Sequence, residues 1–146
     1  MDVFSAEKRS AVMSAIRAEN TKPEMALRQA LHRLGYRYVL HDSRLPGKPD
    51  LVFPRSKVAL QVRGCFWHLH SCLDGHLPRS HAKYWRPKLH KNAQRDRRND
   101  RKLREMGWHL IVVWECQCRN SLLLARQVDR IVRLLNDRKP LFRDGR

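Results

Sequence analysis

The chain has 146 residues, with 31 Lys or Arg against 14 Asp or Glu, so its formal net charge is +17. This charge density disfavours self-association and attracts polyanions, nucleic acid above all, with an affinity that falls as salt rises. The length suits one domain, and 42% hydrophobic residues suffice for a core. Because the sequence shows no signal-peptide core and no apolar run of membrane-spanning length, we expect a cytoplasmic protein without membrane contact. A monomer is expected because the sequence shows no sustained heptad and no exposed apolar stripe.

Two helices are predicted first. Residues 5–18 carry apolar side chains at helical spacing, on an N-terminal arm over residues 1–20 that has little apolar surface to bury. Residues 21–24, Thr-Lys-Pro-Glu, form a capping box with proline in the first turn. The second helix begins there and is closed by Gly35.

Strand-like and helical patterns then alternate. Short apolar runs separated by turn residues predict strands over residues 36–40, 50–53 and 58–62. A charged helix over 88–106, a strand over 108–114 and an amphipathic helix over 121–137 follow. This order predicts an α/β fold in which helices flank a mixed sheet. We expect a core domain over residues 21–138 and a C-terminal tail over residues 139–146.

Residues 65–72, Cys-Phe-Trp-His-Leu-His-Ser-Cys, concentrate potential metal ligands. Cys65, His70 and Cys72 can offer two thiolates and an imidazole, and a tetrahedral zinc site needs a fourth ligand. Cys116 is the best candidate, because the apolar run before it predicts a buried strand that brings a distant thiolate to the same place. Cys118 is then a spare. The alternative is that the cysteines are reduced and only pack, while disulfides fit a reducing cytosol less well.

A second group of residues suits Mg²⁺ beside a scissile phosphate. Asp50 opens a predicted strand, the adjacent strand offers a second polar group, and Glu24 lies on an upstream helix, an arrangement that nucleases use. Asp50 is the first-choice magnesium ligand, although a turn aspartate is the alternative. Glu24 is also explained by its capping position alone. His68 lies between the candidate zinc ligands, so it is free to act as a general base on a water.

Phe66 and Trp67 are two adjacent large aromatics in a very basic chain. They could insert into a base stack. The free energy needed to unstack the bases is lowest where a mismatch already weakens the stack. Packing in the core explains them equally well. The basic segment over residues 91–104 could line phosphates, or it could be a solvated helix face.

Several motifs resemble the very short patch repair endonucleases, in the same order, over about residues 8–135. They are Thr-Lys-Pro-Glu at 21–24, Leu-Pro-Gly-Lys-Pro-Asp at 45–50, Gly-Cys-Phe-Trp-His-x-His-x-Cys at 64–72, Lys-Asn-x-x-Arg-Asp at 91–96, and Gly-Trp followed by Val-Trp-Glu-Cys at 113–116. The resemblance implies a strand-specific DNA endonuclease that nicks 5′ of the thymine in a T:G mismatch produced by deamination of 5-methylcytosine. It also implies a restriction-endonuclease-like core, with double-stranded DNA and possibly mismatch-repair proteins as partners.

The resemblance further implies roles for individual residues. Asp50 would be the Mg²⁺ ligand together with the main chain of Val62, His68 the general base, Asp96 its orienting partner, and Glu24 a holder of metal-bound water. Cys65, His70, Cys72 and Cys116 match the ligands of a structural zinc. Phe66 and Trp67 match the aromatic wedge that enters the duplex beside the mismatch, and Met13 and Ile16 fall where the family's N-terminal helix inserts apolar side chains from the minor groove. Asn92 sits at a matching position near the active site. Apart from the resemblance, Lys88 on the basic helix is a candidate for contact with the mismatch or its backbone.

The sequence departs from the family pattern at Arg63, where a histidine is usual. Arginine can stabilise negative charge on a phosphate but cannot donate a proton. Gln61 likewise stands where broader nuclease relatives often place a carboxylate. Two alternatives therefore remain beside the repair endonuclease: a catalytically weak module that binds mismatches, and a nuclease with a relaxed or different target.

Overall fold

The computed structural model describes residues 19–72 and 81–138. Within these ranges it contains a four-stranded mixed sheet in the order β1-β2-β3-β4, accompanied by three α-helices. The mixed α/β architecture predicted from the sequence is thereby confirmed. The predicted helix over residues 5–18, with Met13 and Ile16, and the tail over residues 139–146 lie outside the described residues.

The first described helix, α2 (Lys22–Arg33), begins where the capping box predicts. The Thr21 hydroxyl accepts a hydrogen bond from the Glu24 amide at 3.4 Å, and a proline occupies the first turn. Leu34 caps the helix after its last residue, Arg33, and Gly35 continues the chain at a φ of +96°, which favours glycine. The local chemistry at both ends thus sets the length of this helix.

The sheet is formed by β1 (Val39–Leu40), β2 (Leu51–Phe53), β3 (Val58–Arg63) and β4 (His109–Trp114). β1 pairs with β2 and β2 with β3 in antiparallel fashion, whereas β3 and β4 are parallel. The prediction of a strand over residues 36–40 was too long. The first residues of that range form hydrogen bonds with α2 instead of a strand. The Tyr36 amide donates to Leu31 O at 3.0 Å, and the Tyr38 hydroxyl donates to Arg28 O at 2.7 Å.

The long helix α3 (Ala82–Glu105) begins six residues before the predicted start at Lys88. Pro87 lies inside the helix, in its first part, although proline has no amide hydrogen to donate. Trp85 and Leu89, one turn apart, are both buried and anchor this early part of α3. The short 3-10 helix η3 (Glu115–Cys118) follows β4, and α4 (Ser121–Asp137) has the predicted bounds.

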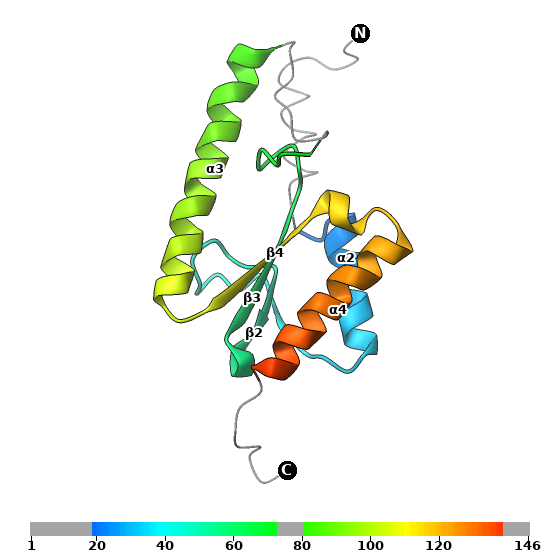
Figure 1. Cartoon of the computed structure of the whole chain (residues 1–146). Helices are drawn as coiled ribbons and strands as arrows, with labels where there is room; N and C mark the ends of the chain where they lie inside the picture. The colour runs from blue at the N-terminus through cyan, green and yellow to red at the C-terminus, as the bar shows by residue number, and fades with distance from the viewer. Residues whose placement is uncertain (1–18, 73–80, 139–146) are drawn as a thin grey trace.

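The helices lie on both sides of the sheet, with α2 and α4 on one face and α3 on the other (Figure 1). The main core fills the space between the sheet, α2 and α4, and it includes Leu27, Leu60, Val113 and Ile131. The first half of α3 extends past the strand ends, beside the segment that follows β3 (Figure 1). No helix among the described residues is long and apolar enough to cross a membrane.

Candidate active site and metal cluster

Asp50 lies immediately before β2, and the β2–β3 register sets it beside the end of β3. Its Oδ2 accepts a hydrogen bond from the Val62 amide at 2.7 Å. The pKa of Asp50 is raised to about 7, first by burial and also by the nearby Glu24, while the Val62 amide and the charge of Arg63 oppose the shift. Such a carboxylate is stabilised by a cation, as expected of a metal ligand.

Glu24 reaches the same place from α2, although its capping position alone could explain its presence. Its side chain is almost fully buried and accepts hydrogen bonds from the Asn20 amide at 3.2 Å and from Arg28 at 3.0 Å. His41 Nε2 lies 2.8 Å from Glu24 Oε2 and 4.0 Å from Asp50 Oδ1. The three side chains can present ligand atoms within 4.8 Å of one another, so the structure brings Glu24 and Asp50 together.

The sequence reasoning missed His41. A signal existed in the pairing of β1 with β2, where Leu40 stands opposite Leu51, because the next pair outward is His41 with Asp50. The His41 amide indeed donates to Asp50 O at 3.1 Å. Finding this pair from sequence requires the register of a strand that is only two residues long.

His68 Nδ1 makes a short hydrogen bond with Asp96 of α3. A carboxylate at Nδ1 fixes the ring and leaves Nε2 for another partner, which suits a general base. The His68 amide donates to Gly64 O at 3.2 Å, so this residue is tied to the end of β3. Gly64 follows Val62, the anchor of Asp50, by two residues, or about 7 Å along an extended chain. The predicted base and the predicted metal ligand are therefore fixed to the same end of β3.

One face of α3 holds this segment in place through polar residues at a four-residue spacing. The side-chain amide of Asn92 donates to Trp67 O at 3.2 Å, Asp96 binds His68, and Asp100 binds Arg63. Both terminal nitrogens of Arg63 contact Asp100, at 2.6 and 3.2 Å, and both residues are buried. Arg63 therefore joins β3 to α3 in this chain, and its interpretation as a phosphate contact stays a prediction.

Four predicted ligands converge beyond the end of β3. Cys65, His70, Cys72 and Cys116 can place their sulfur and nitrogen atoms within 4.8 Å of one another. Typical zinc–ligand bonds of about 2.3 Å to sulfur and about 2.0–2.1 Å to nitrogen imply about 3.6 Å between two such ligands of a tetrahedron. Cys116 Sγ and His70 Nδ1 are 3.6 Å apart. The donor set thus fits a tetrahedral soft ion.

Burial and neighbouring thiols raise the pKa of Cys65 to about 12, and burial also raises the pKa of Cys116. Thiols of this kind ionise when a cation joins them. His70 stacks on Trp114 of β4 at 4.1 Å between ring centroids, which fixes its orientation. Cys118 packs against the main core outside this group, and its role as a spare stays a prediction.

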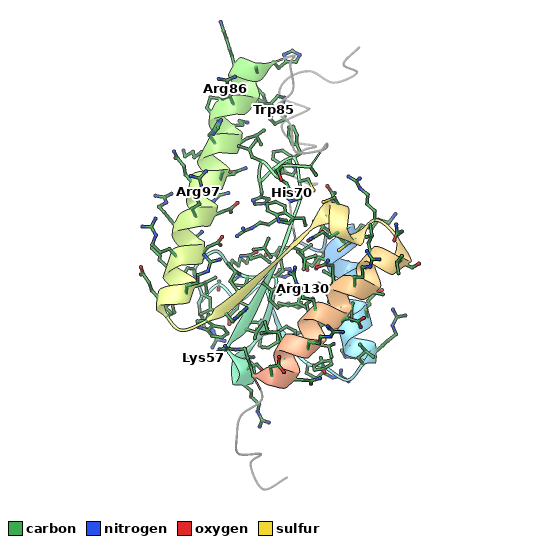
Figure 2. The ribbon with its side chains drawn as sticks, viewed as in Figure 1. Lys57, His70, Trp85, Arg86, Arg97 and Arg130 are labelled. Atoms are coloured by element: carbon green, nitrogen blue, oxygen red, sulfur yellow. The ribbon has the colours of Figure 1, made fainter. Side chains whose placement is uncertain are left out.

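Phe66 and Trp67 belong to an aromatic cluster with Trp85 on α3. The three rings meet edge to face, with centroids 5.2 to 5.8 Å apart. Trp67 is buried, and Phe66 is partly buried. Figure 2 shows Trp85 on the side of α3 that faces the segment carrying His70. The sequence reasoning missed Trp85, although its spacing from buried Leu89 is that of a helix face. Core packing is thus observed, and insertion into DNA stays a prediction.

Two other predicted DNA contacts lie on the same helix. Lys88 Nζ donates to the Tyr84 hydroxyl at 2.9 Å and lies 4.4 Å from the centroid of that ring. Asn92 is buried beneath Trp67. Most basic residues of the segment over 91–104 are exposed, so they form a solvated face of α3.

Comparison with known proteins decides the family. A family model described as DNA mismatch endonuclease Vsr matches residues 1–74. The DNA mismatch endonuclease Vsr of Escherichia coli is 37% identical over 81% of this chain and 76% of that protein. The chain belongs to the Vsr family. It is therefore a Vsr-like DNA endonuclease, as the sequence motifs predicted.

Other relatives of this Vsr-family chain carry a different name. The type II nicking enzyme V.NmeAIP of Neisseria meningitidis is 41% identical over 93% of this chain and 97% of its own length. The type II nicking enzyme V.XorIIP of Xanthomonas oryzae pv. oryzae is 47% identical over 80% of this chain and 85% of its own length. The family thus joins proteins named for mismatches and proteins named for nicking.

Proposed function

We propose that this Vsr-family chain is a Mg²⁺-dependent endonuclease that nicks one strand 5′ of the thymine in a T:G mismatch. Such mismatches arise by deamination of 5-methylcytosine, and the nick would initiate very short patch repair. The observation that carries the proposal is the anchoring of Asp50 and of the His68–Asp96 pair to one end of β3. That arrangement supplies a metal-binding carboxylate and an oriented base within reach of one phosphate.

Each residue has a defined part in this reaction. A divalent cation bound by Asp50, with the Val62 main chain beside it, would neutralise charge on the scissile phosphate. His68 accepts a proton from the attacking water at Nε2, because Asp96 holds its Nδ1. Glu24 would hold metal-bound water beside Asp50. Arg63 holds the position of α3 through Asp100 and lowers the cost of ionising Asp50.

Zinc in the Cys/His cluster would be structural, because four protein ligands leave no open position for substrate. It would brace the segment that carries both His68 and the aromatic pair Phe66 and Trp67. The aromatic pair, with Met13 and Ile16 of the N-terminal arm, would then select base steps that unstack cheaply. Selection of the substrate and cleavage would share one metal-braced segment.

The proposal includes the remaining finer expectations. A mixed sheet between helices is compatible with the restriction-endonuclease-like core that the resemblance implies. Action as a monomer on chromosomal DNA in the cytoplasm, alongside mismatch-repair proteins, belongs to the same proposal. Lys88 would contact DNA near the mismatch from the first half of α3, with Asn92 supporting the aromatic pair from below.

A second candidate function rests on the names of the relatives. Two relatives that match most of this chain are called type II nicking enzymes, which favours a nuclease tied to one sequence context. A chain of this kind would nick at its own target sequence, with less dependence on the mispair. A weak mismatch-binding module is the third possibility, favoured by the engagement of Arg63 with Asp100.

The experiment is cleavage of an end-labelled duplex with one T:G mismatch in the presence of Mg²⁺. Wild type is compared with Asp50→Ala, His68→Ala and the exposed control His32→Gln. A nick 5′ of the mismatched thymine that both alanine variants lose, and the control keeps, supports the proposal. Binding without any cut supports the mismatch-binding module, and equal cutting of matched DNA supports the nicking enzyme.

A further inference from the structure

His41 lies where a metal ligand would lie, beside Glu24 and Asp50. An ion with six ligands at about 2.1 Å places neighbouring ligand atoms about 3.0 Å apart and opposite ones about 4.2 Å apart. His41 Nε2 lies 2.8 Å from Glu24 Oε2 and 4.0 Å from Asp50 Oδ1. Both separations are close to those of ligands that share one such ion.

The other ring nitrogen of His41, Nδ1, also has a carboxylate partner. His41 Nδ1 lies 3.3 Å from Glu19 Oε2, and Glu19 in turn pairs with Lys48. Histidines that bind metals usually donate their second N–H to a carboxylate, which fixes the tautomer and makes the metal-facing nitrogen a better ligand. His41 thus has the partner that a ligand needs, on the side away from Glu24 and Asp50.

The backbone of His41 is also unusual. Its φ is +47°, in the left-handed region that a residue with a side chain rarely adopts. The hydrogen bond from its amide to Asp50 O maintains this conformation next to the β1–β2 pair. Residues held in such conformations gather at functional sites, where the rest of the fold fixes them.

We propose that His41, Glu24 and Asp50 form a three-ligand site that takes a first-row transition ion such as Mn²⁺ in preference to Mg²⁺. Imidazole suits transition ions, whereas Mg²⁺ favours an all-oxygen shell with several waters. The ion would lie between His41 Nε2 and Glu24 Oε2, which are now in direct contact. Arg28 and the Asn20 amide stay on Glu24 and hold its carboxylate toward the ion.

The site deepens the proposed function, because it names the cation preference of the same active site. Its test uses the zinc-loaded full chain and Mn²⁺ as the probe, and free Mn²⁺ is followed by electron paramagnetic resonance. The variants are His41→Gln, Glu19→Gln and the exposed control His32→Gln. Circular dichroism and zinc content confirm that each variant is folded.

We expect one Mn²⁺ to bind wild type and the His32→Gln control alike. His41→Gln should weaken this binding about tenfold or more, and Glu19→Gln should weaken it by about tenfold through the orientation of the ring. The affinity for Mg²⁺, measured by competition with Mn²⁺, should fall much less in the same variants. Equal Mn²⁺ affinity in wild type and folded His41→Gln would overturn the inference.

Nicking of the T:G duplex in Mg²⁺ by the same wild-type preparation separates the two claims. Cleavage by wild type without a His41-dependent Mn²⁺ site overturns the inference and leaves the proposed function standing. A His41-dependent Mn²⁺ site in a chain that does not cleave supports the inference and contradicts the proposed function.

Discussion

Breaking the buried ion pair between Arg63 and Asp100 should destabilise the chain much more than loss of a surface pair. The two side chains are only 9% and 12% exposed and share two contacts, at 2.6 and 3.2 Å. Removing one partner of a buried pair costs about 3–5 kcal/mol, because the other charge stays in the interior. At about 2–4 °C for each kcal/mol in a chain of this size, Asp100→Ala should lower Tm by about 6–20 °C.

The assay is thermal and urea unfolding of the zinc-loaded protein. The matched control is Lys48→Ala, which removes an ion pair with Glu19 between side chains that are 53% and 44% exposed and should cost less than about 1 kcal/mol. The double variant Arg63→Leu with Asp100→Leu should recover most of the loss, because apolar residues of similar volume can replace a buried pair.

Two results would refute this reasoning. One is an Asp100→Ala variant that is no less stable than Lys48→Ala, which would mean that water reaches the pair between Arg63 and Asp100. The other is a double variant as unstable as either single one, which would mean that the charges themselves hold β3 to α3. A stable double variant that no longer nicks DNA would assign the pair to the reaction rather than to the fold.

Three further predictions concern the site itself. Asp96→Asn should slow single-turnover nicking by about 10²–10⁴-fold with little change in Tm, because His68 loses its orienting carboxylate; a loss below about threefold would contradict this role. Because the folded-state pKa of Asp50 is raised to about 7, ionising it costs the metal-free protein stability as pH rises from about 4 to about 7. Asp50→Asn should therefore be more stable than wild type in urea at about pH 8 and equal to it near pH 4, and equal stability at both pH values would argue against a buried Asp50. Protein stripped of zinc by a strong chelator and then returned to excess Mg²⁺ should have a lower Tm and should not nick until Zn²⁺ is restored. Cys118→Ser should keep the bound zinc. Full nicking by zinc-free protein in Mg²⁺ would contradict a structural metal.

Local chemistry explains which elements could be predicted from the sequence. The start of α2 follows from Thr21 and Pro23, whose effects act within one turn, and α4 follows from an apolar stripe and its capping Asn120. The start of α3 could not be predicted in the same way. Burial of Trp85 against residues after β3 is a tertiary effect, and it outweighs the break that Pro87 suggests.

The site shows the same division between local and distant information. Cys65, His70 and Cys72 lie close in sequence, and Cys116 could be added because a strand delivers it. The pairing of Arg63 with Asp100 joins residues 37 positions apart, and no local pattern encodes the packing of α3 on the sheet. The position of His41 beside Asp50 follows only from the register in which β1 pairs with β2. The strand β1 itself is short because the residues before it bind to α2.

The most direct test of the central claim is single-turnover nicking of two duplexes that differ at one base pair. One carries T:G and the other C:G in the same sequence, each strand is labelled in turn, and Mg²⁺ is present. The account predicts a nick in the thymine strand, 5′ of the mismatched base, with the C:G duplex left intact. Equal rates on both duplexes, or tight binding to T:G without any nick, would contradict it.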